Sequence, residues 1–378
     1  MNYRIPFNRP TLIPEAISCV SEVIRSGRLS GNGPCTHACE ARLRELTGAH
    51  AALLTSSCTT ALEMSALLVE ARPGDEVIIP SFTFVSTANA FAMRGFTPIF
   101  ADCRPDTLNV DAATIAPLIG PRTRAIVVMH YGGVACEMDE ILAVAQRHNL
   151  VVIEDNAHGL FATYKGRPLG SLGSMAAQSF HETKNVTSGE GGALLLNAAS
   201  LVERAEVLRE KGTNRSRFFR GEVDKYTWVD LGSNYLASEI QAAYLLAQLR
   251  ASDLVQSMRT AIWNRYDAEL KDWAGANGVD RQTVPPHCEH PSHLYYLLMP
   301  TASARTRLID HLKAQGILAV FHYIPLNLSP MGRKLGGTAG ACPVAEDVSE
   351  RLLRLPLYTN LSADDQSDVI AAVQQFRV

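Results

Sequence analysis

The chain has 378 residues, of which 47% are hydrophobic and 19% charged, so it is long enough for one large domain and a smaller second one. Its formal net charge is −3 and its acidic and basic residues are interspersed, which excludes the basic stripe of a nucleic-acid-binding protein and the polybasic tail of a membrane-surface protein. No apolar run reaches the roughly 20 residues of a transmembrane helix, and the first residues lack the layout of a signal peptide. We therefore expect a cytoplasmic protein that acts on small molecules, with neither nucleic acid nor membrane as a partner.

The eight cysteines are scattered, with no C-x-x-C pair and no zinc-site spacing. We interpret them as reduced core or near-site residues, and we expect no metal site and no disulfide.

The first elements predicted are two helices and a loop. Residues 11–25 place apolar side chains at a helical period, and a glycine-rich loop with Gly27, Gly31 and Gly33 follows. This loop is a plain linker or a backbone surface for a phosphate or sugar, and its position alone does not decide. We then expect Thr36 to cap a second helix.

Residues 51–70 predict an anion-binding site. Residues 51–55 indicate a short strand, and the hydroxyl-rich turn Ser56 to Thr60 leads directly into a helix. The backbone N–H groups and the positive end of a helix dipole suit a phosphate monoester, so Thr59 and Thr60 are candidate ligands. The alternative is that Ser57 or Thr59 only caps the helix. The G-x-G-x-x-G fingerprint of dinucleotide sites is not present.

Strand and helix patterns alternate from residue 74 to residue 155, which predicts an α/β fold with a mainly parallel, doubly wound sheet. Parallel strands end at one rim of such a sheet, where ligands bind. On this rim we expect the residues that follow the predicted strands: Phe84, His130, Tyr131, Asp155, His158, Ser179 and Lys184.

Asp155 stands one residue beyond the apolar run 150–153, at the end of the predicted strand. A carboxylate buried there requires a cation or a hydrogen-bond donor, and a protonated pyridine nitrogen would be such a partner; a helix N-cap is the alternative role. Phe84 would cover a flat cofactor ring or belong to the core. His158 would contact the phenolic oxygen of such a ring or make an ordinary polar contact.

Lys184 follows a buried strand within the stretch QSFHETKNVTSGEGGALLL. An amine beside apolar surface loses solvation of its charged form, so its pKa falls and it can form a Schiff base with pyridoxal phosphate. An ordinary loop lysine at a strand end is the alternative.

The alternation of elements that starts near residue 250 predicts a second, smaller α/β domain. We expect one long helix over residues 238–265, a strand over 293–299, a helix over 305–316, a strand over 317–325 and a last helix from Ala363. The predicted large domain spans residues 1–250 and the small domain 251–378. Tyr131, together with His322 and Tyr323 from the small domain, would contact substrate.

Taken together, these blocks resemble a known family. PGDEVIIPSFTFVSTANA, VVIEDNAHG, SFHETKN and GEGGALL resemble the markers of the DegT-like nucleotide-sugar aminotransferases, which are fold-type I enzymes dependent on pyridoxal phosphate (PLP). The runs around GSNYLASEIQAAYLLAQL, AVFHYIPL and SERLLRLPLY are similar to the branch that aminates dTDP-4-keto-6-deoxyglucose at the fourth carbon. The resemblance implies a large domain with a mainly parallel seven-stranded sheet.

The resemblance also implies roles for individual residues. Lys184 would hold PLP through a Schiff base and move the proton to the sugar carbon. Asp155 would pair with the ring nitrogen, Phe84 would stack on the ring, and His158 would lie by its phenolic oxygen. The phosphate would be bound by Thr59, Thr60 and Ser179, and by Asn234 of the neighbouring subunit in a homodimer whose active site is shared across the interface. The substrates would be a nucleotide-linked ketosugar and L-glutamate.

Two departures concern the substrate. DNAH stands at residues 155–158 where the fourth-carbon branch has DAAQ, and Leu236 stands where many relatives carry a basic residue. The alternatives are an aminotransferase for a 3-keto nucleotide sugar and a non-catalytic regulatory protein with a PLP fold; a sugar dehydratase is disfavoured because those relatives carry histidine at the position of Lys184. The nucleotide base, the axial or equatorial amine, and the pathway stay open.

Overall fold

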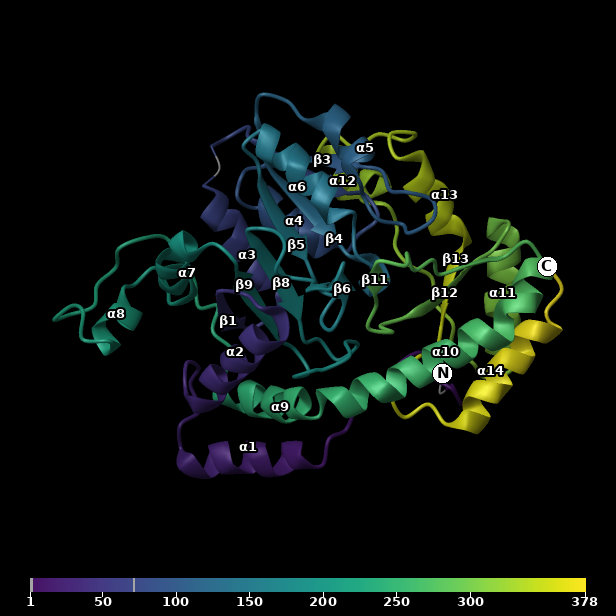
Figure 1. Ribbon diagram of the computed structural model, residues 1–378, viewed down its shortest axis with the longest axis horizontal. Helices are drawn as coiled ribbons and strands as arrows, with labels where there is room; N and C mark the ends of the chain where they lie inside the picture. The colour runs from purple at the N-terminus through teal and green to yellow at the C-terminus, as the bar shows by residue number, and fades with distance from the viewer. Residues whose placement is uncertain (1–2, 71) are drawn as a thin grey trace.

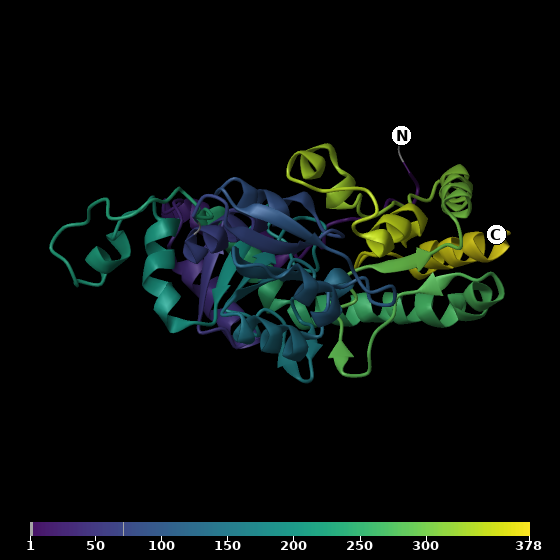
Figure 2. The same ribbon diagram turned by 90° about the horizontal axis from the view of Figure 1, so that it is seen from above.

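The computed structural model describes residues 3–70 and 72–378, and it places a seven-stranded sheet and a three-stranded sheet beside each other (Figures 1 and 2). In the described part of the chain, no helix is both long and apolar enough to cross a membrane. That same part contains no cluster of three or more His, Cys, Asp or Glu side chains suited to a metal ion, and all eight cysteines are free.

The seven-stranded sheet has the order β1-β9-β8-β5-β4-β2-β3. Only β9 is antiparallel to its neighbours, so the prediction of a mainly parallel sheet is confirmed. Its strands are short apolar runs, as expected where both faces of a sheet are covered. They are β1 (Ala51–Thr55), β2 (Glu76–Pro80), β3 (Thr97–Ala101), β4 (Thr123–Met129), β5 (Val151–Asp155), β8 (Met175–Ser179) and β9 (Gly192–Leu196).

Successive side chains of each strand enter the cores on opposite faces, because side chains alternate along a strand. Leu53 and Val127 pack with one group of helices, and Leu54 and Val128 pack with the other. The first face is covered by α3 (Cys58–Val69), α4 (Val85–Ala92) and α7 (Val202–Arg209); the second by α2 (Pro34–Thr47), α6 (Met138–Arg147), α9 (Glu239–Arg250) and the short α5 (Ala112–Ile115).

The predicted cap at Thr36 is wrong. Helix α2 begins two residues earlier at Pro34, whose fixed φ suits a first helical position. Thr36 lies inside the helix, and its hydroxyl donates to the buried carboxylate of Glu239, which also accepts the backbone N–H groups of Gly33, Cys35 and Thr36. The start of α2 is therefore capped by a residue about 200 positions away.

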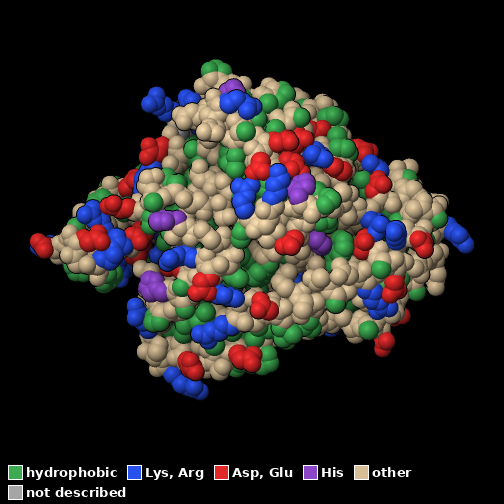
Figure 3. Space-filling view, viewed as in Figure 1, with side chains coloured by type: hydrophobic (Ala, Val, Ile, Leu, Met, Phe, Trp, Pro, Cys, Tyr) green, Lys and Arg blue, Asp and Glu red, His purple; other side chains and the backbone are tan. Residues whose placement is uncertain are grey.

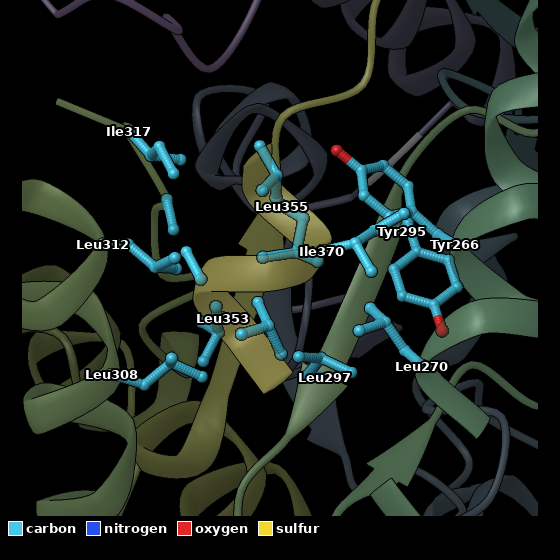
Figure 4. Packing of buried hydrophobic residues seen from close by; sticks show 14 of the residues in the cluster. Tyr266, Leu270, Tyr295, Leu297, Leu308, Leu312, Ile317, Leu353, Leu355 and Ile370 are labelled. Atoms are coloured by element: carbon cyan, nitrogen blue, oxygen red, sulfur yellow. The ribbon is translucent and has the colours of Figure 1, made fainter. Parts of the chain in front are cut away.

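The three-stranded sheet holds the second core. Figure 4 shows Leu297 and Leu353 of its strands packed against Leu270, Leu308 and Ile370 of the surrounding helices. The elements around this core are β10 (Asp280–Arg281), β12 (Tyr295–Leu298), β13 (Leu352–Leu355), α10 (Ser252–Ala276), α11 (Ala302–Ala314) and α14 (Ala363–Gln375). Between α11 and β13 the chain also forms α12 (Pro330–Lys334) and α13 (Pro343–Arg351). A further small sheet joins the two parts through β11 (Cys288–Glu289), β6 (Thr163–Tyr164) and β7 (Arg167–Pro168).

Two predicted elements of this region differ in the structure. The long helix over residues 238–265 is two helices, α9 and α10, which meet at Ala251 and lie end to end along one edge of the molecule (Figure 1). The predicted strand over residues 317–325 is wrong: Ile317 and Val320 each make one isolated bridge, with Ile5 and Arg354, and the chain then turns at Pro325. We propose Ala251 as the boundary between the two domains.

The N-terminal segment is built into the second core. Ile5 is fully buried there and pairs with Ile317, and the Thr11 hydroxyl lies 2.9 Å from that of Thr359. The segment then enters α1 (Glu15–Ser26), which packs on α9. The beginning of the chain therefore belongs spatially with its end.

Residues 211–234 form an arm that carries α8 (Arg215–Phe219) and extends away from the body (Figures 1 and 2). Phe219 is 64% exposed, Trp228 72% and Leu231 65%. Charges of both signs are spread over the face seen in Figure 3, including this arm. The arm therefore presents large apolar side chains that no part of the described chain covers.

Candidate active site

A cavity of about 840 Å³ lies where the large sheet meets the smaller one. Its walls come from the carboxyl ends of β5 and β8, the start of α3, the loop before α4 and the segments 320–324 and 354–357. The volume is that of a site for a cofactor together with a small substrate.

Lys184 reaches this cavity from the turn that follows β8, where its backbone N–H donates to the His181 carbonyl oxygen at 2.9 Å. The side chain is partly accessible from the cavity and is otherwise surrounded by protein. Burial lowers the pKa of the Lys184 amine to about 8, against smaller opposite effects of Cys58 and Asp155. About half of the amine is therefore in the neutral, nucleophilic form near pH 8.

Asp155 ends β5 and is 4% exposed at the cavity wall. Its Oδ2 accepts the Thr87 hydroxyl at 2.6 Å, and its Oδ1 accepts the Ala157 N–H at 3.2 Å. Burial raises its pKa, and the Thr87 hydrogen bond is the largest effect in the other direction. In residues 3–70 and 72–378 no basic side chain forms an ion pair with Asp155. A protonated ring nitrogen of PLP fits this buried, unpaired carboxylate.

The start of α3 forms the anion cup. Ser57 and Thr60 make a capping box, in which each backbone N–H donates to the other side chain at 3.1 Å. The capping role of Ser57 is thus real. The residues that line the cavity here are Ser57, Cys58, Thr59 and Ser179. Thr60 does not line the cavity, because its hydroxyl takes part in the cap.

Gly192, the first residue of β9, allows the cup to form. A Cβ at this position would lie 2.3 Å from the Ser57 carbonyl carbon and 2.4 Å from the Cys58 nitrogen. Only glycine permits this approach of β9 to the helix start. The last glycine of the GEGG turn is thus required by packing.

Phe84 precedes α4 and is 55% exposed, with its ring centroid 6.3 Å from that of Tyr323. It lines the cavity and is not a core residue, so a flat ring beside Asp155 has an aromatic wall.

His158 lies in the cavity wall, where burial holds its pKa well below the usual value, so the imidazole is neutral. Its Nδ1 accepts the Gly132 N–H at 3.3 Å, and its ring centroid lies 4.2 Å from that of His293. The Nδ1 of His293 is 2.9 Å from Oδ1 of Asn185, the residue after Lys184. His158 is thus held by the Gly132 N–H and by the ring of His293, which Asn185 contacts in turn.

His322 and Tyr323 line the cavity, as the site prediction places them, although the segment that carries them is not a strand. Tyr131 does not line the cavity: it is buried, and its hydroxyl lies 3.0 Å from His322 Nδ1. Tyr131 can therefore position His322.

Two other predicted residues lie away from the cavity. Asn234 is exposed on the arm, where it forms an isolated bridge with Glu210. His130 was expected at the rim, but it points into the interior because side chains alternate at the end of β4, and its Nε2 lies 3.0 Å from the Glu154 carboxylate.

Three residues of the site were not predicted: Thr87, His293 and Arg354. Thr87 lies one helical turn after Phe84, a spacing that would have identified it. His293 and Arg354 come from the second core, and no local pattern marks them.

Comparisons with known proteins agree with this geometry. The profile of the DegT/DnrJ/EryC1/StrS aminotransferase family matches residues 10–374. The spore coat polysaccharide biosynthesis protein SpsC of Bacillus subtilis is 37% identical over 99% of this chain and 97% of its own. The crystal structure of the aminotransferase TlmJ from Streptoalloteichus hindustanus is similar with a TM-score of 0.89 at 33% identity, over 98% of both chains. The PLP form of the putative sugar aminotransferase Spr1654 from Streptococcus pneumoniae gives a TM-score of 0.91 at 28% identity, again over 98% of both chains.

Fold and site thus define a PLP-dependent aminotransferase with the α/β architecture of fold type I. Within that class, the chain belongs to the DegT/DnrJ/EryC1/StrS aminotransferase family, as its motifs indicated.

Proposed function

We propose that the protein transfers the amino group of L-glutamate to the fourth carbon of dTDP-4-keto-6-deoxy-D-glucose, giving a dTDP-4-amino-4,6-dideoxy-D-hexose. The observation that carries the proposal is the cavity whose walls contain both Lys184 and Asp155, at the end of the large sheet, and His322 and Tyr323. The resemblance of the blocks after residue 209 to the fourth-carbon branch supports the choice of substrate.

Each residue of the site would have a separate role toward the cofactor. Bound PLP supplies a carbonyl that exchanges amino groups and a ring that stores the electron pair of a broken C–H bond. Lys184 would bind it and, as a neutral amine, accept and return the proton at its Nζ. Asp155 would hold a proton on the ring nitrogen, and Phe84 would cover the ring. The cup of Ser57, Cys58, Thr59 and Ser179 would bind the phosphate.

The neutral imidazole of His158 would contact the phenolic oxygen of PLP. It would act as a hydrogen-bonding group without charge, because burial keeps its pKa well below its usual value. This replaces the amide that the fourth-carbon branch carries at the same position.

A homodimer belongs to the proposal. The apolar arm needs a partner surface, and Phe219, Trp228 and Leu231 are each more than 60% exposed on it. Asn234 lies at the base of this arm, outside the cavity of its own chain, so it would reach the PLP phosphate of the neighbouring subunit. The eight free cysteines suit a reducing compartment, and we place the enzyme in the cytoplasm.

The test is to incubate the purified holoenzyme with dTDP-4-keto-6-deoxyglucose and L-glutamate and to identify the product by NMR. We expect an amino sugar with nitrogen on the fourth carbon, and the coupling constants would assign it as axial or equatorial. Turnover of a 3-keto nucleotide sugar alone would contradict the fourth-carbon assignment. Bound PLP without turnover of either sugar would indicate the non-catalytic alternative.

A further inference from the structure

Arg354 lies in β13, and its side chain lines the cavity. Its backbone pairs with that of Val320, with N–O distances of 2.7 and 3.2 Å in the two directions, and its guanidinium carbon lies 4.6 Å from the centre of the Phe7 ring. Both contacts hold the side chain in place without neutralising its charge.

The guanidinium of Arg354 has N–H donors that no acceptor in the described chain satisfies. Nη2 donates to the Phe321 carbonyl oxygen at 3.1 Å, whereas the buried Nε has no hydrogen-bond partner. Throughout residues 3–70 and 72–378, no carboxylate lies within ion-pair distance of it. Burial lowers its pKa without removing its charge, since an arginine stays protonated.

Two other buried arginines have their main partners within the chain. Arg259 donates to the carbonyl oxygens of Ser292 and His293, and Arg209 pairs with the Glu40 carboxylate, although the Nε of Arg209 has no hydrogen-bond partner. Arg354 differs from Arg209 in having no carboxylate partner among the described residues, and from both in lining the cavity.

The surroundings of Arg354 favour an anion at the reacting end of the cavity. Arg354 lines the same cavity as Lys184, His158 and His322, and its positive charge contributes to the lowered pKa values of all three. The cofactor phosphate has its own cup at the start of α3, so it does not require this arginine.

We propose that Arg354 binds a carboxylate of the amino donor through the Nη groups at the end of its guanidinium. Nε is buried and would not be reached, whereas charged N–H donors at the end of the guanidinium match the oxygens of a carboxylate. The diphosphate of a nucleotide sugar is the other oxyanion that enters such a site, but it lies several bonds from the ketone carbon, whereas Arg354 lines the same cavity as Lys184. The inference rests on the proposed function, because it takes the donor to be an amino acid such as L-glutamate.

The test compares binding of 2-oxoglutarate and of dTDP to the holoenzyme by calorimetry in R354Q, R354K and the wild type. We expect R354Q to weaken 2-oxoglutarate binding about 100-fold and R354K about 10-fold, with dTDP binding unchanged in both. The control is R333Q, since Arg333 is exposed on α12 outside the cavity, and it should leave both ligands unaffected.

The outcomes separate the possibilities. Weaker dTDP binding with unchanged 2-oxoglutarate binding would assign Arg354 to the nucleotide diphosphate and overturn the proposal. An equal loss for both ligands, together with a lower melting temperature, would make its role structural and also overturn it. If the wild type fails to aminate dTDP-4-keto-6-deoxyglucose while its 2-oxoglutarate affinity still depends on Arg354, the substrate assignment fails and the donor site stands.

Discussion

The reactivity of Lys184 comes from where the chain holds it, between apolar cavity walls and the carboxylate of Asp155. A K184A variant should lose the visible absorbance of lysine-bound PLP and all measurable transamination, because neither the Schiff base nor the proton carrier remains. Absorbance spectra and a 2-oxoglutarate release assay measure both. K313A, in an exposed position on α11, is the control and should match the wild type. Retained turnover in K184A would contradict the role assigned to this lysine.

The lowered pKa of Lys184 predicts a pH dependence for PLP uptake. Only the neutral amine attacks an aldehyde, and the fraction of neutral amine rises as the pH approaches a value of about 8 and then levels off. The rate of PLP binding by the apoenzyme should therefore rise up to about pH 8 and change little above it. Stopped-flow absorbance over pH 6 to 10 provides the measurement. A rate that kept rising to the ordinary lysine value near pH 10.4 would show that burial does not act on this amine.

At the residue scale, the sequence predicted the side chains that directly follow strands. Lys184 and Asp155 could be placed because parallel strands end at one rim, and their cavity positions agree with that expectation. Tyr131, Thr60 and His130 have the right position along the chain, but their side chains turn to other partners. Which way a side chain points after a strand depends on packing that one local segment does not encode.

At the scale of the elements, β9 and the start of α3 lie too close together to admit one more carbon atom at Gly192. G192A should destabilise the protein by about 3 kcal/mol or more and weaken PLP binding, because the new Cβ would meet the Ser57 and Cys58 backbone. Chemical denaturation and a PLP titration measure the two effects. The matched control is G275A at an exposed position of helix α10, where nothing lies within 4 Å of the added Cβ. We expect this change to raise the free energy of unfolding by roughly 0.5–1 kcal/mol. A G192A protein as stable as the wild type would show that β9 can move away from the cup.

The strands of the large sheet could be predicted closely because each is a short apolar run between turn residues; β1 has the predicted bounds of residues 51–55. The break at Ala251 could not, since apolar residues continue at a helical period across it. The absence of a strand at residues 317–325 has a tertiary cause. Residues 320–324 of this segment line the cavity, and its backbone pairs with β13 in an isolated bridge at Val320, so this extended, apolar sequence does not form a ladder.

At the scale of the whole molecule, the proposed homodimer makes a prediction about mixed subunits. K184A and N234A should each be inactive or strongly impaired alone. If Asn234 serves the neighbouring subunit, a mixed dimer has one site with both residues intact, so equal mixing should restore about a quarter of wild-type activity. Refolding the two variants together and assaying 2-oxoglutarate release tests this. No recovery, despite mixed dimers shown by mass spectrometry, would place Asn234 in its own subunit's site or outside both.

The N-terminal segment has a practical consequence for anyone who produces this enzyme. Ile5 is locked into the C-terminal core, and Phe7 and Asn8, two and three residues later, are part of the cavity wall itself. Removing a dozen residues from that end would delete both side chains from the wall, including the ring that the Arg354 guanidinium contacts. Val378 is 39% exposed, so an affinity handle is better attached at the opposite terminus.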